Sequence, residues 1–243
     1  MVERKQGRRC AQTAEETKMH ILCVAGSMFC QKGYEKVSLR NISETAGVSH
    51  SLIRHHFGSK EQIWYAISDS LHEYMMGYLS ELIAQFPKDK PANVSLYHFA
   101  TKLLVHTLLI PQPIQFIADA VRQEGEFFDY FIDQNGKFRE VTLALVNRHN
   151  KEHPNHSIKL DELKWQMLLF GHGAISLKPL LNQIWSEETD DPDQALYNHW
   201  NLFNKLMVNT LDIPKEEILA PESLDELLLP IACKFSEEYG CQS

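Results

Sequence analysis

Residues 38–61 read SLRNISETAGVSHSLIRHHFGSKE, a pattern that predicts two short helices joined by a tight turn and followed at once by a third helix. Ser38 is a good N-cap for the first helix, whose apolar positions recur at helical spacing. Gly47 follows where a helix ends with positive φ, a conformation that glycine adopts without strain. Ser49 can cap the second helix in the same way. The stretch therefore has the form of a helix-turn-helix, which places its second helix in the major groove of DNA.

The second and third helices of this stretch carry the polar groups that DNA binding requires. The apolar Leu52 and Ile53 are expected to face the first helix. The outward face of the second helix is polar and rich in donors, and consists of His50, Ser51, Arg54 and His55. Ser59, three residues before Gln62, has the spacing of a capping box, so Lys60 and the free amides of the third helix lie where a DNA phosphate could dock.

The motif and its flanks resemble the TetR family of transcriptional regulators over about residues 14–68. The resemblance rests on residues that match in register: Gly33-Tyr34, Ile42, Ala46-Gly47-Val48-Ser49, His56-Phe57 and Ser59-Lys60-Glu61. It implies an all-α protein, in which a three-helix helix-turn-helix head is joined by a long helix to a helical ligand-binding and dimerisation body. The remainder of the chain shows no motif that we can match to a family.

The resemblance also implies which residues contact double-stranded DNA. Positions that face base edges in the family are occupied by Arg40, His50, Ser51 and Leu52, and the candidate phosphate contacts are Arg54, His55, His56 and Lys60, with Ser49 completing the predicted DNA-binding set. Arg54 stands where the family usually has tyrosine. Because arginine binds phosphate and also reaches guanine edges, the base preference there is open.

The charge of the chain is divided between its two parts. Residues 1–60 hold ten Lys or Arg against five Asp or Glu, and residues 61–243 hold fourteen against twenty-seven, so a head of net +5 precedes a body of net −13. A basic head on an acidic body favours DNA binding in one orientation and with strong salt dependence.

Composition favours long helices and a reduced, cytoplasmic protein. Of 243 residues, 44% are apolar, and the eleven glycines and ten prolines fall mostly at candidate turns. Five cysteines are an odd number without a disulfide framework, and no signal peptide or membrane-spanning run is visible. Cys23 and Cys30 lie seven residues apart on one helix face. We interpret them as small buried side chains; a redox-sensing pair is the alternative.

Four segments organise the chain. They are a flexible basic arm at 1–12, a DNA-binding head at 13–60, an effector-binding and dimerisation body at 61–211, and a tail at 212–243 to which no role is assigned. Helices are expected at 13–31, 59–86, 93–110, 113–123, 126–150, 160–185 and 192–211. Asn135-Gly136 and Pro179 are signals that can break the two helices in which they lie.

The helix expected at 160–185 carries more apolar surface than one neighbour can cover, and the helix at 192–211 adds further apolar residues. The pattern alone favours an internal core pair, whereas the resemblance to regulators that dimerise through these helices favours a homodimer. The predicted dimer interface consists of Phe170, Ala174, Leu177, Leu181, Trp200, Phe203 and Met207.

Aromatic and apolar residues also concentrate at 99–131 and 163–177. They either pack as a core or line a cavity for a largely apolar small molecule, and the resemblance favours the cavity. The predicted effector pocket consists of Phe99, Leu103, His106, Phe116, Phe127, Phe128, Trp165, Met167, Phe170 and His172.

Other chemistry has weak support in the sequence. His149 and His153 share a helix face near His156, but no acidic partner completes a metal-binding pattern, and no phosphate loop or nucleophile elbow is present. We therefore expect no cofactor, no metal and no enzyme activity.

The favoured function is a repressor released from an inverted-repeat operator by an apolar molecule. The alternatives are a DNA-binding adaptor whose body binds a protein and, remotely, a metal-dependent enzyme. An enclosed apolar cavity would favour the repressor, and a filled core with an exposed apolar patch would favour the adaptor.

Overall fold

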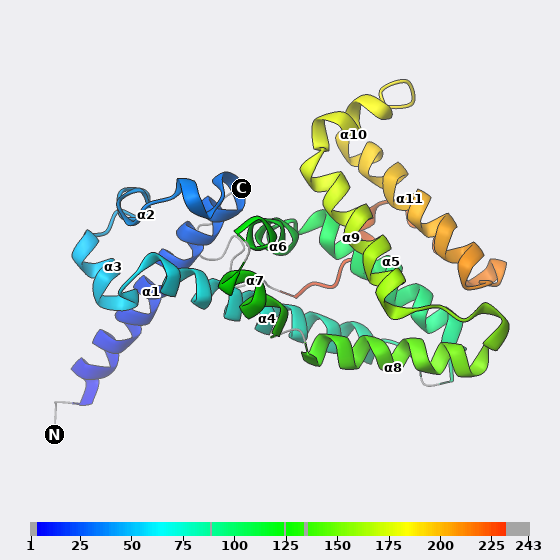
Figure 1. Cartoon of the computed structure of the whole chain (residues 1–243), viewed down its shortest axis with the longest axis horizontal. Coiled ribbons are helices and arrows are strands. Elements are labelled where there is room, and N and C mark those ends of the chain that lie inside the picture. The colour runs from blue at the N-terminus through cyan, green and yellow to red at the C-terminus, as the bar shows by residue number, and fades with distance from the viewer. Residues whose placement is uncertain (1–3, 88, 124, 134–135, 232–243) are drawn as a thin grey trace.

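The computed structural model of the chain describes residues 4–87, 89–123, 125–133 and 136–231, and within these ranges every regular element is a helix (Figure 1). The α-helices are α1 (Arg4–Lys32), α2 (Leu39–Ala46), α3 (His50–Phe57), α4 (Lys60–Ala84), α5 (Ala92–Leu109), α6 (Gln112–Gln123), α7 (Glu126–Asp133), α8 (Gly136–Glu152), α9 (Leu160–Ser176), α10 (Lys178–Ile184) and α11 (Pro192–Thr210). Short 3-10 turns are η1 (Tyr34–Lys36), η2 (Pro154–His156), η3 (Lys215–Glu217) and η4 (Leu224–Leu227). The predicted all-α fold is confirmed.

The head consists of α1, α2, α3 and the first turns of α4, packed around one apolar cluster. Ile21 and Phe29 of α1, Ile42 of α2, Ile53 of α3 and Trp64 of α4 are all fully buried in this cluster. Each helix thus contributes one apolar face, and its remaining faces stay exposed. This arrangement holds α3 at the end of the molecule far from α8–α11 (Figure 1).

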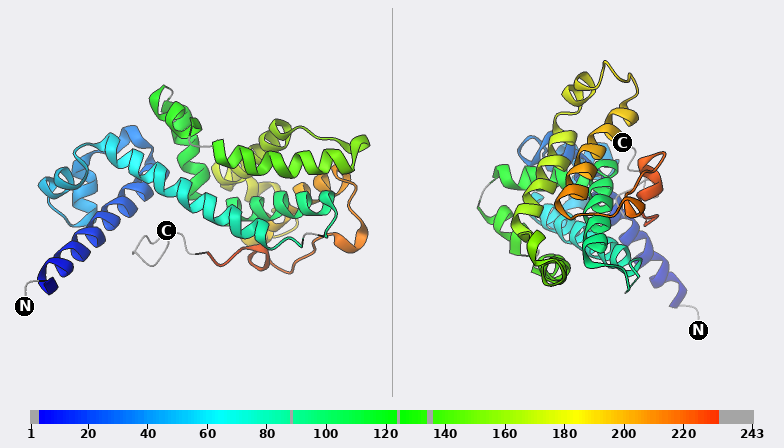
Figure 2. Two further views of the ribbon diagram at one scale, coloured as in Figure 1. Left: turned by 90° about the horizontal axis from the view of Figure 1, so that it is seen from below. Right: turned by 90° about the vertical axis from the view of Figure 1, so that its right-hand side faces the viewer.

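The body is built around α5, which is apolar on nearly all sides. It contacts α8, α9 and α11, and its buried side chains include Tyr97 and Leu104. A helix that is apolar on all sides must be buried on all sides, so the other body helices pack around α5. α4 runs from the head along this body, as the sequence predicts (Figure 2).

Three predicted boundaries differ from those in the structure. The segment predicted as a flexible arm is helical from Arg4 onward, because α1 already begins there and extends away from the head (Figure 2). Arg, Lys, Gln, Ala and Glu propagate a helix readily once its later turns are buried. The helix predicted at 126–150 is divided into α7 and α8 around residues 134–135, which lie outside the described ranges. The helix predicted at 160–185 is divided at Leu177, because Pro179 lies in the first turn of α10.

The tail has a structural role that the sequence did not indicate. Through residue 231 it runs back along the body (Figure 2), and Leu224, Leu227 and Leu229 bury their side chains there. The hydroxyl of Tyr97 accepts a hydrogen bond from the Leu219 amide at 2.9 Å. These contacts make the described part of the tail a component of the body core.

No single helix in the described ranges is long and apolar enough to cross a membrane; α5 and α6 meet the criterion only together, as a pair bent by 82°.

Candidate nucleic-acid interface

The start and the end of α2 are set by short-range hydrogen bonds. Ser38 Oγ accepts from the Asn41 amide at 3.2 Å, and Asn41 Oδ1 accepts from the Ser38 amide at 3.0 Å, which completes a capping box. Gly47 ends the helix in the left-handed conformation, with φ of 64°. Both predicted boundary residues are confirmed.

The α3 helix is oriented by a cap on one side and by burial on the other. Ser49 Oγ accepts from the Leu52 amide at 3.2 Å, while Ile53 and Phe57 are buried against the rest of the head. Ser59 caps α4 in the same manner, accepting from the Gln62 amide at 3.3 Å. The buried pair directs the remaining side chains of α3 away from the core.

The predicted DNA contacts lie on α2, on α3 and its cap, and on the first residue of α4. Those whose side chains are exposed are Arg40, Ser49, His50, Ser51, Arg54 and His55, and those half-buried are Leu52, His56 and Lys60. Arg40 pairs with Glu44, one turn along α2, at 2.8 Å. Such an exposed pair is weak and can exchange for a contact with DNA.

Lys60 is engaged within the protein. Its Nζ donates to the Tyr34 carbonyl at 3.1 Å and lies 3.8 Å from the centre of the Tyr34 ring. The Tyr34 carbonyl takes one of the three N–H donors of this ammonium group, so a phosphate contact would have to use another. The structure therefore gives Lys60 a role in holding η1 against α4, which the sequence motif did not reveal.

This role predicts that Lys60→Met destabilises the fold. Loss of one charged hydrogen bond and one cation–π contact should lower the free energy of unfolding by about 1–3 kcal/mol. Denaturant titration measures this quantity. The control is Lys36→Met, at an exposed position of η1 two residues after Tyr34. A contact made only with phosphate would leave the stability unchanged and weaken DNA binding alone.

Two cysteines of α1 are described, and neither is arranged for redox sensing. Cys23 is buried. Cys30 Sγ lies 3.5 Å from the Gln112 carbonyl, and burial, together with the nearby Asp119 carboxylate, raises the pKa of its thiol to about 12. Since the thiolate is the reactive form, burial and this pKa disfavour the redox interpretation.

Comparison with known proteins supports the interpretation of the head. The family model described as "Bacterial regulatory proteins, tetR family" matches residues 21–67, which cover α2, α3 and the parts of α1 and α4 that pack on them. The transcriptional regulator AcrR of Shigella flexneri is 37% identical over 102 residues, which are 42% of this chain and 44% of AcrR. The match thus spans less than half the length of that relative.

Solved structures extend the likeness to the whole fold. PfmR, a TetR family regulator from Thermus thermophilus, has a TM-score of 0.50 at 19% identity, over 78% of this chain and 97% of its own. The chain thus has a head that matches the TetR family model and a fold shared with TetR family regulators. A putative fatty acid metabolism regulator from Clostridium perfringens shares the fold as well, with a TM-score of 0.52 at 13% identity, over 83% of this chain and all of its own. TetR proteins are transcriptional regulators and not enzymes.

The structure separates the residues that were predicted to form a TetR effector pocket. Phe116 and Phe127 stack on Trp64 in the head cluster, with ring centroids 4.9 and 4.4 Å from the Trp64 ring. Phe99 and Leu103 are buried in a different cluster, formed between α4 and α5. These four side chains lie in filled parts of the core.

The other predicted pocket residues lie in varied surroundings. His106 is buried, and its Nε2 is 2.9 Å from the Tyr74 hydroxyl. Burial lowers the pKa of His106 to about 4, so its imidazole is neutral at pH 7. Trp165, by contrast, is 61% exposed, and half-buried His172 bonds Ser176 at the surface. The remaining members are Met167 and Phe170, half-buried against the body core, and Phe128, whose side chain lies outside the described residues.

The predicted dimer helices are present, but most of the chosen side chains face inward. Those buried within the single chain are Ala174, Leu181, Trp200, Phe203 and Met207. Phe170 is half-buried on Phe203, and Leu177 is 54% exposed. The structure thus places these five side chains in the core of the single subunit, where α5 packs against α9 and α11.

The histidine cluster of α8 is structural. His149 is buried, and its Nε2 bonds the His156 carbonyl at 2.9 Å, which holds η2 against α8. His153 stacks on the His149 ring with centroids 5.2 Å apart. Within the described ranges, no group of three or more histidine, cysteine or acidic side chains is placed to hold a metal ion.

Proposed function

We propose that this TetR protein is a homodimeric repressor that binds an inverted-repeat operator, with α3 of each subunit in successive major grooves about 34 Å apart. The observation that carries the proposal is the capped α2–turn–α3 unit, which holds exposed donors such as His50, Ser51 and Arg54 at one end of the molecule. The family match over this unit supports it.

An exposed apolar surface on α9–α11 supports the homodimer. Its large apolar side chains are Trp165, Leu169, Leu177, Leu180, Ile184 and Leu202. Trp165 and Leu169 lie four residues apart and so share one face of α9. Large apolar side chains exposed on neighbouring helices indicate an interaction site, and these lie on the helices through which TetR regulators dimerise. We name these six residues the α9–α11 face.

Operator selection tests the DNA-binding proposal. The wild-type protein should enrich an inverted repeat from random duplexes, and its affinity for that operator should exceed its affinity for a scrambled duplex at moderate salt. Arg40→Ala should lower operator affinity by roughly tenfold and relax the preference at one base pair, because the resemblance to TetR regulators assigns Arg40 to a base-facing position. Equal affinity of the wild-type protein for operator and scrambled DNA would contradict the proposal.

We further propose that a largely apolar small molecule releases the operator. The support is the aromatic density along α4–α6 and the neutral, buried His106, a suitable single hydrogen-bond partner. Because Phe99, Leu103 and Phe116 are fully packed, an effector must separate body helices to enter. Such a ligand favours the opened conformation, and it weakens DNA binding if that conformation misplaces the heads.

A thermal-shift screen of acyl chains, aromatic compounds and drugs tests this mechanism. A compound at a hundredfold excess over its dissociation constant should stabilise the protein by about 2.7 kcal/mol and should weaken operator binding. Compounds that stabilise the protein but leave operator affinity unchanged would rule out induction.

Two observations favour the adaptor as a second candidate. The core side chains Phe99, Leu103 and Phe116 are packed, and the α9–α11 face is exposed in the single chain. A regulator whose body binds another protein fits these features without a ligand. An empty screen, combined with a monomer in sedimentation, would favour this function.

A further inference from the structure

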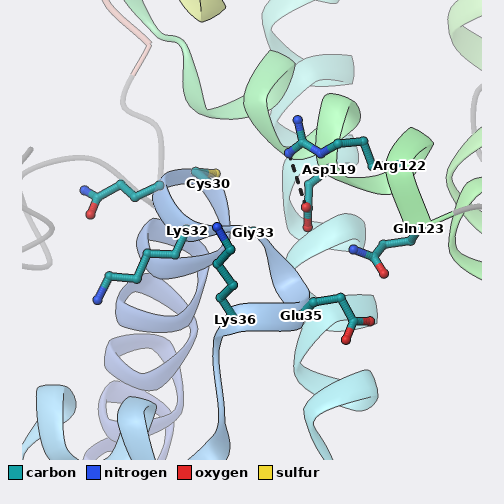
Figure 3. Close-up of a pocket in the computed structure, with 9 residues that line it drawn as sticks. Cys30, Lys32, Gly33, Glu35, Lys36, Asp119, Arg122 and Gln123 are labelled. Atoms are coloured by element: carbon teal, nitrogen blue, oxygen red, sulfur yellow. Dashed lines mark hydrogen bonds and ion pairs between the residues drawn. The ribbon is translucent and has the colours of Figure 1, made fainter.

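A buried carboxylate of the body bonds the backbone of the head, beside the apolar packing of α6 on α1. Asp119 lies on α6 and is 2% exposed, and its Oδ2 accepts a hydrogen bond from the backbone amide of Tyr34 at 2.8 Å. Tyr34 is the first residue of η1, the turn between α1 and α2. Figure 3 shows Asp119 and Arg122 on α6, opposite the end of α1 and the turn that follows it. An acceptor on the body thus satisfies a donor on the head.

The space around this carboxylate is narrow. Gly33 has φ of 82°, and a Cβ at Gly33 would lie 3.1 Å from Asp119 Oδ1. The second partner of Asp119 is Arg122, whose Nη2 lies 3.3 Å from Oδ1 and whose side chain is 64% exposed. The hydrogen bond from Tyr34 to Oδ2 is therefore buried, whereas the ion pair between Oδ1 and Arg122 faces solvent.

Tyr34 is held from several directions at once. Lys60 of α4 bonds its carbonyl, as described above, and the Phe127 ring of α7 packs edge-on against its ring at 4.9 Å. The Trp64 ring lies next to Phe127 and joins this contact to α4. Elements of the body, α6 and α7, thus hold the turn that leads directly into the helix-turn-helix.

We infer that Asp119 is a positioning residue for DNA binding, which sets the orientation of the head on the body through the Tyr34 amide. The inference rests on the proposed function. A buried backbone N–H without an acceptor is costly, so the bound orientation of η1 is favoured over others. An operator with two half-sites requires both heads of a dimer at the groove spacing, whereas a single half-site does not.

This difference between full site and half-site gives the test. Asp119→Ala removes the acceptor, and its affinity for the full operator should fall by about tenfold. Its affinity for a duplex that carries one half-site should stay within about twofold of the wild type, because each head remains folded. Asp119→Asn keeps a side-chain oxygen able to accept from Tyr34 and should restore most of the full-site affinity. Arg122→Ala, which removes only the exposed partner, is the matched control and should leave both affinities unchanged.

Two further readouts follow the contact itself. A cavity of about 310 Å³, lined by Cys30, Lys36, Asp119 and Arg122 among others, lies beside it (Figure 3). In Asp119→Ala, the Tyr34 amide should exchange hydrogen faster, and a thiol reagent should label Cys30 faster, because the thiol is covered by α6, which then packs less tightly on the end of α1. Amides within α2 and α3 should keep their wild-type protection.

Several results would contradict the role proposed for Asp119. Equal losses at full site and half-site, with loss of protection in α2 and α3, would make Asp119 a folding residue and overturn it. Unchanged full-site affinity despite faster exchange at Tyr34 would also overturn it. If Asp119→Asn behaves as Asp119→Ala does, the hydrogen bond is not the cause. A wild-type protein that does not distinguish operator from scrambled DNA would instead refute the proposed function.

Discussion

Charges on the α9–α11 face are expected to dissociate the dimer and to remove most operator affinity. Leu169 and Ile184 are 54% and 63% exposed, so Leu169→Glu with Ile184→Glu should be tolerated by the folded subunit. In a dimer, the same two carboxylates would be buried against apolar surface, which is strongly unfavourable. Sedimentation should then give the mass of a monomer.

Operator affinity should fall with the loss of the second head. Two linked heads bind about 10² to 10⁴ times more tightly than one, so the double variant should lose affinity by at least about a hundredfold. Leu143→Glu is the matched control, because Leu143 is also exposed but lies on α8, on the opposite edge of the body from α10 (Figure 1). A double variant that remains dimeric would place the interface elsewhere.

Trp200→Ala is expected to have the largest effect on stability. Trp200 is fully buried in the body core, and its Nε1 donates to the Thr101 carbonyl on α5 at 3.2 Å. Truncation leaves a cavity and removes the indole hydrogen bond to α5, and should lower the free energy of unfolding by about 3–5 kcal/mol. Denaturant titration of the subunit measures this loss.

The matched control for Trp200→Ala is Leu202→Ala, two residues later on the exposed side of α11. Leu202→Ala should leave subunit stability nearly unchanged and weaken dimerisation. Were Trp200 an interface residue, as the sequence suggested, its truncation would change the dimer dissociation constant while leaving subunit stability intact. The two variants therefore distinguish a core position from an interface position on one helix.

The head could be predicted from sequence because its signals are local. Ser38, Gly47 and Ser49 act on amides and carbonyls within four residues, so their effect does not depend on the rest of the fold. Burial of Ile42 and Ile53 follows from helical spacing in the same short segment. Lys60 was the exception, because its partner Tyr34 is distant in the sequence.

The body was predicted less well because its helices are apolar on more than one side. The sequence located α9 and α11 and indicated that more than one face needs a partner. It did not show which face α5 covers, and so Trp200 and Phe203 were assigned to the interface although they belong to the core. One feature of the sequence could have indicated that Asp119 is buried: it lies three positions after Phe116, on the same helix face as that buried ring.

The sequence by itself determined the resemblance of the head to TetR regulators, the all-α class, the caps of α2 and α3 and most helix ends, because hydrogen bonds and helical spacing within a few residues encode them. Only the tertiary structure decided which apolar face is core and which is free, that Lys60 and Asp119 meet at Tyr34, and that the tail completes the body. These features depend on contacts between residues far apart in the chain, and the pattern within any one helix does not specify its distant partner.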